Sequence, residues 1–66
     1  MEKIDLSREL IEALSNQYRG NIQAARANVR VYLENPAGIG EHPDIITSID
    51  SQIQIIADNQ EKLDIL

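Results

Sequence analysis

Four side chains form a row suited to holding an anion, and they are Arg19, Gln23, Arg26 and Arg30. Their spacings of 4, 3 and 4 residues place them on one face of a helix. Guanidinium groups grip phosphates and carboxylates through paired N–H donors. The row therefore allows two interpretations: a site for an anionic ligand, or a solvated face that pairs with acids of another helix, such as Asp50 and Asp58. The many nearby acids favour the second.

Two glycines and a histidine form a further candidate anion site between two predicted helices. Gly38 and Gly40 can adopt positive φ and turn successive N–H groups inward as a nest for an anion, while His42 could donate to a phosphate. Against this, Glu41 and Asp44 would repel an anion. The alternative is a structural turn in which His42 caps the second helix. No lysine follows the glycines, so the segment is not a P-loop.

The two candidates meet at one end of the predicted hairpin, where they would form one ligand site. Its members would be Arg26, Arg30, Tyr32, Gly38, Gly40 and His42. Tyr32 could stack on a base, so a nucleotide is the class of ligand that this site predicts.

The site would bind its ligand without turnover, because the chain lacks a catalytic set. The sequence has no cysteine and a single histidine, and no nucleophile is marked by its surroundings. One histidine cannot build a zinc site. We therefore expect no enzymatic activity, no metal and no cofactor.

Helices predicted over about 6–34 and 43–65 position these residues. Apolar positions recur on one face of the first, at Ile4, Ile11, Leu14, Tyr18, Ile22, Ala25, Val29 and Leu33. The second has a seam of alternating spacing, at Ile46, Ile49, Ile53, Ile56, Gln60 and Leu63. Asp5 or Ser7 can cap the first helix, Asn35-Pro36 ends it, and Pro43 suits the first position of the second.

The connection suits an antiparallel helical hairpin, so the fold class is all-α and the 66 residues form one domain. Leu33 would face Ile45 or Ile46, and the Tyr18 hydroxyl would bond Gln60. The predicted core comprises Leu14, Tyr18, Ile22, Val29, Ile49, Ile53 and Ile56.

A surplus of aliphatic side chains beyond one seam predicts a homo-oligomer with a helical-bundle core. A chain this small rarely holds a sufficient core alone, and without cysteine a second copy is the remedy left. The predicted interface comprises Ile4, Leu10, Ile11, Ala13, Gly20, Ala24, Ile55 and Leu66. Small residues there, with Ala27 beside them, would allow a close helix contact; the alternative is that the alanines serve helix propensity alone.

The charge excludes several partner classes. The net charge is −5, and residues 35–66 hold six acids with Lys62 as their one base. Duplex nucleic acid is therefore a poor partner. No apolar run approaches the ~18 residues of a membrane span, and the N-terminus mixes charges where a signal peptide would be apolar. We expect a soluble, intracellular protein.

The segment Tyr32–Ile45, with the sequence YLENPAGIGEHPDI, resembles small proteins of tailed bacteriophages that have no assigned activity. The resemblance extends through Gln17–Ile22 and into the second helix. It implies a phage accessory role in the host cytoplasm or in the virion, and it transfers no site residue.

Two functions of different class follow. The first is a non-catalytic binding module, a homo-oligomer that contacts a host protein or forms part of a virion. The alternative is an anti-defence sponge that sequesters a host nucleotide signal without cleaving it.

Overall fold

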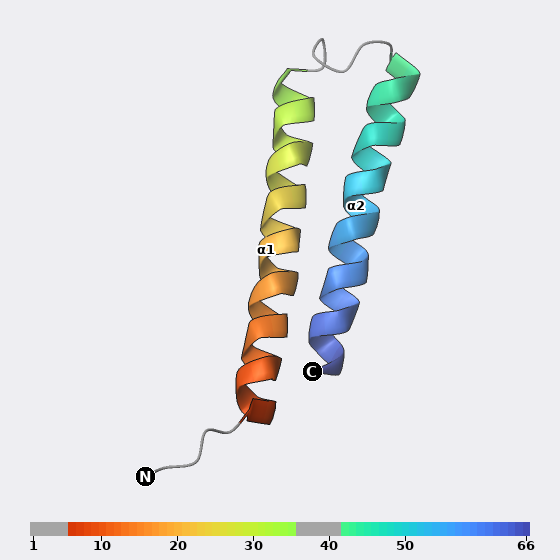
Figure 1. The fold of residues 1–66 in the computed structure, drawn as a ribbon. Helices are drawn as coiled ribbons and strands as arrows, with labels where there is room; N and C mark the ends of the chain where they lie inside the picture. The colour runs from red at the N-terminus through yellow and green to blue at the C-terminus, as the bar shows by residue number, and fades with distance from the viewer. Residues whose placement is uncertain (1–5, 36–41) are drawn as a thin grey trace.

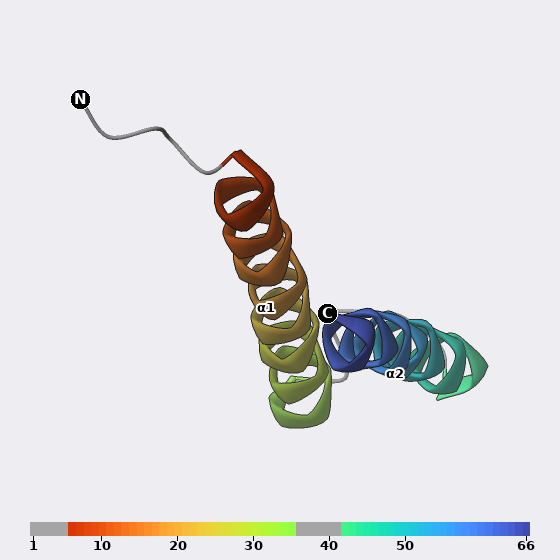
Figure 2. The ribbon, with the colours of Figure 1, turned by 90° about the horizontal axis from the view of Figure 1, so that it is seen from below.

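A computed structural model of the chain describes residues 6–35 and 42–66, and these residues form two antiparallel helices (Figure 1). Helix α1 spans Leu6–Glu34 and α2 spans His42–Ile65, against predicted ranges of 6–34 and 43–65. The described residues contain no strand, so the prediction of an all-α helical hairpin is confirmed for a single chain. Figure 2 shows that the helices diverge toward the ends that hold Glu34 and His42.

The ends of the helices follow local rules. Glu9 and Asp44 lie in the first turns of α1 and α2, where carboxylates favour the positive end of the helix dipole. Ser7 lies inside α1 and so does not cap it, while Asp5 lies outside the described residues. The N–H of Asn35 donates to the Val31 carbonyl (2.9 Å) at the end of α1.

A narrow seam joins α1 to α2, and only two of the described residues are buried in it. These are Ala25, 2% exposed, and Asn59, 6% exposed. Half-buried side chains extend the seam on both helices, at Ser15, Tyr18, Ile22, Val29 and Tyr32 of α1 and at Ile45, Ser48, Ile49, Gln52, Ile56 and Leu63 of α2. Together with Ala25 and Asn59, these residues follow one another at spacings that alternate between 3 and 4, as in a coiled coil, apart from the extra Ser48.

Polar contacts set the register of the seam. Asn21 Nδ2 donates to Asn59 Oδ1 (3.0 Å), and Asn28 Nδ2 donates to Gln52 Oε1 (3.1 Å). The Lys62 ammonium lies 5.6 Å from the centre of the Tyr18 ring, a cation–π distance. In all three pairs the residue numbers add to 80, so one register holds along the hairpin.

The predicted contact between Tyr18 and Gln60 is wrong. Gln60 is exposed and donates to Asp64 Oδ1 (3.1 Å) on its own helix. Asn59, rather than Gln60, faces α1, and it accepts the hydrogen bond from Asn21 at the centre of the seam. α2 is therefore rotated relative to the prediction.

This rotation also corrects the predicted core. Tyr18, Ile22, Val29, Ile49 and Ile56 are half-buried in the seam as expected. Ile53 is 49% exposed and Leu14 is 39% exposed, so neither is core in a single hairpin. Ile46 and Leu33 are still more exposed, at 59% and 66%. The apolar stripe of each helix therefore points only partly at the other helix.

Candidate binding groove

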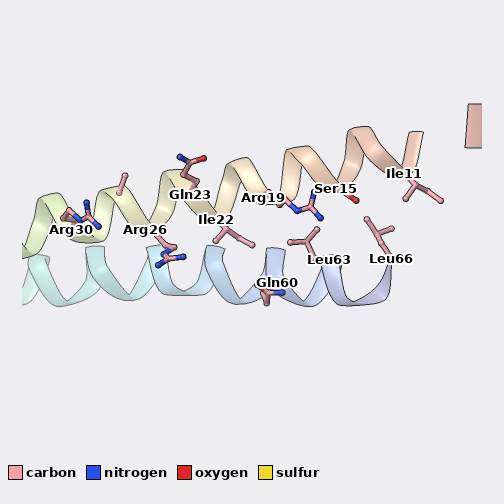
Figure 3. A pocket seen from close by; sticks show the side chains of 11 residues that line it. Ile11, Ser15, Arg19, Ile22, Gln23, Arg26, Arg30, Gln60, Leu63 and Leu66 are labelled. Atoms are coloured by element: carbon pink, nitrogen blue, oxygen red, sulfur yellow. The ribbon is translucent and has the colours of Figure 1, made fainter. Parts of the chain in front are cut away.

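An open groove of about 900 Å³ runs along one side of the hairpin, between α1 and α2. It is lined by Ile11, Ser15, Arg19, Ile22, Gln23, Arg26, Ala27 and Arg30 of α1 and by Gln60, Leu63 and Leu66 at the end of the chain. Figure 3 shows Ile22 and Leu63 between the two helices. The groove thus has an apolar floor and a strongly basic α1 edge.

A smaller hollow of about 400 Å³ continues this surface toward the other end of the hairpin. Its lining shares Arg26 and Arg30 with the larger groove and adds Val29, Leu33, Glu34, Ile53 and Ile56. We call the two together the groove face. Of the apolar residues left outside the seam, Ile53 and Leu33 lie on this face, whereas Leu14 and Ile46 are outside its lining.

The arginine row lies on the groove face and is not neutralised within the hairpin. In residues 6–35 and 42–66, Arg19, Arg26 and Arg30 form no ion pair. The expectation that Asp50 and Asp58 pair with this row is therefore wrong for a single chain. Asp58 instead accepts a hydrogen bond from Gln54 Nε2 (2.8 Å) on its own helix.

The cause is the rotation of each helix about its own axis. The row lies beyond the seam on the groove side of α1, whereas the carboxylates of α2 lie outside the groove lining. The result is a basic strip on a chain of net charge −5. Such a strip favours a ligand or partner that carries carboxylates or phosphates.

The structure brings together only part of the predicted ligand site. Arg26 and Arg30 line the groove face. Tyr32 is half-buried in the seam and is not among the lining residues. Gly38 and Gly40 lie outside the described residues, and His42 is the first residue of α2, with its side chain outside the description.

Sequence reasoning left Arg19 and Gln60 out of the candidate site, although both line the groove. Arg19 could have been included, because it belongs to the same 4-3-4 row as the chosen arginines. Gln60 could not, because the sequence pattern assigned it to the seam with α1.

The predicted interface residues are exposed to different degrees and on different sides. Ile11 and Leu66 line the groove, at 48% and 50% exposed. Leu10 and Ile55 are exposed outside its lining, at 65% and 38%. The small residues Ala13, Gly20 and Ala24 are exposed on α1, and Ile4 lies outside the described residues.

Other kinds of site are not found in the part of the chain that the structure describes. No cluster of three or more His, Cys, Asp or Glu there could hold a metal ion. Neither described helix is long and apolar enough to cross a membrane.

Comparison with protein-family models, curated proteins and solved structures finds no match to this chain.

Proposed function

We propose that this chain is a non-catalytic binding protein that works as a helical homo-oligomer, with the groove face as its contact surface. The observation that carries the proposal is the position of its large apolar side chains. Leu6, Leu10, Ile11, Leu14, Val31, Leu33, Ile46, Ile53, Ile55, Ile65 and Leu66 are all at least 38% exposed. Four of them, Ile11, Leu33, Ile53 and Leu66, line the groove face.

Exposure on this scale is unfavourable for a chain that stays alone in water. Each large aliphatic side chain gains roughly 1.5–3 kcal/mol when it is fully buried. Contiguous apolar patches on soluble monomers usually mark a binding surface. Two buried residues make a minimal core, so association with another helical surface supplies the burial that the single hairpin lacks.

The resemblance to small phage proteins supports a place for such a module in the infected host cell or in the virion. A hairpin of this kind acts by covering a surface of its partner, and nothing in this role requires a cofactor. The partner beyond the chain itself would be a host protein or another virion protein.

Light scattering on the purified full chain at micromolar concentration tests the proposal. We expect a mass of two or more chains, each of 7.4 kDa. A mass of one chain over the whole micromolar range would overturn it.

A second candidate is the nucleotide sponge, and the three arginines without an ion pair in the described chain favour it. Bidentate N–H donors on an apolar floor suit the phosphates and the base of a nucleotide. Calorimetry with cyclic nucleotides and nucleotide-sugar derivatives tests this role. The sponge requires tight binding that is lost in Arg26→Ala/Arg30→Ala while the oligomer persists; a parent protein that binds none of these nucleotides would exclude it.

A further inference from the structure

We propose that the groove face is covered by the groove face of a second copy, related by a two-fold axis parallel to the helices. The arginine row of α1 then lies against the acidic edge of α2 in the other copy. This inference rests on the proposed homo-oligomer and names its interface. Three observations lead to it: the direction of the apolar stripes, the charges at the edges of the groove, and the register of the hairpin.

Part of the apolar stripe of each helix is turned toward the groove side. On α2, Ile49, Ile56 and Leu63 are half-buried in the seam, whereas Ile53 is exposed on the groove face. On α1, Ile22 is half-buried while Leu33 is 66% exposed on the same face. A helix in a four-helix bundle has two neighbours and directs its stripe between them, so this offset predicts a second pair of helices over the groove.

The α1 edge of the groove is basic, and acidic side chains lie beyond its α2 edge. The α1 edge holds Arg19, Arg26 and Arg30. On α2, Asp64 accepts a hydrogen bond from Gln60, which lines the groove. Asp50 precedes Asp64 by 14 residues, two heptads, and so shares its face of the helix. The acidic edge therefore lies just beyond the apolar residues of α2.

The register of the hairpin brings these charges to the same height. Rotation about a two-fold axis parallel to the helices leaves the height of every residue along the helices unchanged. A residue of α1 is therefore level with the residue of α2 in the other copy whose number brings the sum to 80. Arg30 is then level with Asp50 of the second copy, and Arg26 is about one turn away. Arg19 is level with Glu61, with Asp64 three residues further, about 4.5 Å along the helix.

The other two-fold arrangement places α1 beside α1 and is disfavoured by charge. There the two arginine rows would face each other, and the acidic edges of α2 would also meet. Like charges placed opposite each other across an interface cost several kcal/mol. The arrangement that pairs α1 with α2 removes both repulsions and makes all neighbouring helices antiparallel.

The exposed area matches what such a dimer needs. The accessible surface of the chain is 5491 Å², whereas a compact protein of this mass exposes about 4,200 Å². The excess exceeds the ~800 Å² that each partner buries in an interface of standard size. One second copy is therefore a sufficient partner for the groove face.

Reversal of the charges on each edge tests the arrangement. One variant of the full chain carries Arg26→Glu and Arg30→Glu, and another carries Asp50→Arg and Asp64→Arg. When two copies of the same variant pair, like charges face each other at both edges of the interface. We therefore expect the Kd of the dimer to rise by roughly 100-fold. Mixed in equal amounts, the two variants have opposite charges at both edges, and we expect a heterodimer of wild-type mass. Asp58 precedes Asp64 by six residues and so lies on a different face of α2. Asp58→Arg is therefore the control that keeps the wild-type mass.

Light scattering and sedimentation read the outcome, and far-UV circular dichroism confirms that each variant is helical. Assembly only in the mixture supports the arrangement. An assembly that survives Arg26→Glu/Arg30→Glu, or a mixture that stays monomeric, overturns this arrangement. If the wild-type chain is still an oligomer, the proposed function stands. A monomeric wild-type chain overturns both.

Discussion

At the residue scale, the centre of the hairpin is held by a polar pair. Asn59 is 6% exposed, accepts a hydrogen bond from Asn21 (3.0 Å) and donates to the Ile55 carbonyl (2.7 Å). A buried amide is tolerated only when its donors and acceptors are satisfied. Because Asn59 both accepts and donates, it fixes the register at little cost.

The first prediction concerns this pair. Asn59→Ala removes the acceptor of the Asn21 amide, so we expect the free energy of unfolding to fall by about 1–3 kcal/mol. Urea unfolding followed by circular dichroism measures the loss. Gln54→Ala, at an exposed position of α2 outside the groove lining, is the matched control and should change stability by less than ~0.5 kcal/mol. Equal losses in the two variants would show that the Asn21–Asn59 bond does not stabilise the hairpin.

The second prediction concerns Ile53, which the sequence placed in the core and the structure leaves 49% exposed. In an assembly through the groove face this side chain is buried, and Ile53→Ala should cost about 2–5 kcal/mol. In the dissociated chain the cost should be below ~1 kcal/mol. Unfolding measured over a concentration series separates the two states. Val31 is exposed on α1, outside the groove lining. The loss of stability in Val31→Ala should therefore not depend on protein concentration.

At the scale of the element, α1 continues through Gly20 although glycine weakens a helix interior. A Cβ at this position would meet nothing within 4 Å in the single chain. The glycine is therefore not required by contacts within the hairpin. The small residues Ala13, Gly20, Ala24 and Ala27 either allow a close contact between copies or serve helix propensity alone, and one substitution distinguishes the two.

The third prediction is that Gly20→Ala raises the free energy of unfolding by roughly 0.5–1 kcal/mol, because alanine restricts the unfolded chain and favours the helix. Thermal unfolding and light scattering on the same sample measure stability and mass. A more stable protein of unchanged mass assigns the small residues to helix propensity. A lost assembly would place Gly20 in a close contact between copies instead.

At the scale of the whole molecule, the hairpin is long and thin. Its radius of gyration is 16.5 Å, whereas a compact domain of this length has about 11 Å. Much of the surface that a globular chain would bury is therefore available to a partner. Stability and assembly should consequently be linked.

The fourth prediction is that the melting temperature rises with protein concentration, because a partner that binds only the folded chain stabilises it by mass action. Salt should lower the gain, since it screens the arginine–carboxylate pairs at the exposed edges of the interface. Calorimetry at several concentrations and two ionic strengths measures both effects. A melting temperature that is independent of concentration would contradict assembly.

The sequence by itself determined the two helices. Apolar spacing near 3.6 residues predicts each of them, and Asn35-Pro36 marks the end of the first. The arginine row was also visible, since a 4-3-4 spacing fixes a common face wherever the helix lies.

Only the tertiary structure decided how each helix is turned about its own axis. Periodicity gives the mean direction of an apolar stripe, but it does not say whether the nearest helix lies along that direction or beside it. Here Asn59 takes the centre of the seam and Ile53 lies on the groove face. The physical reason is that hydrogen-bonded amides such as Asn21 and Asn59 are tolerated at a buried contact, so the most buried strip of a helix need not be its most apolar one.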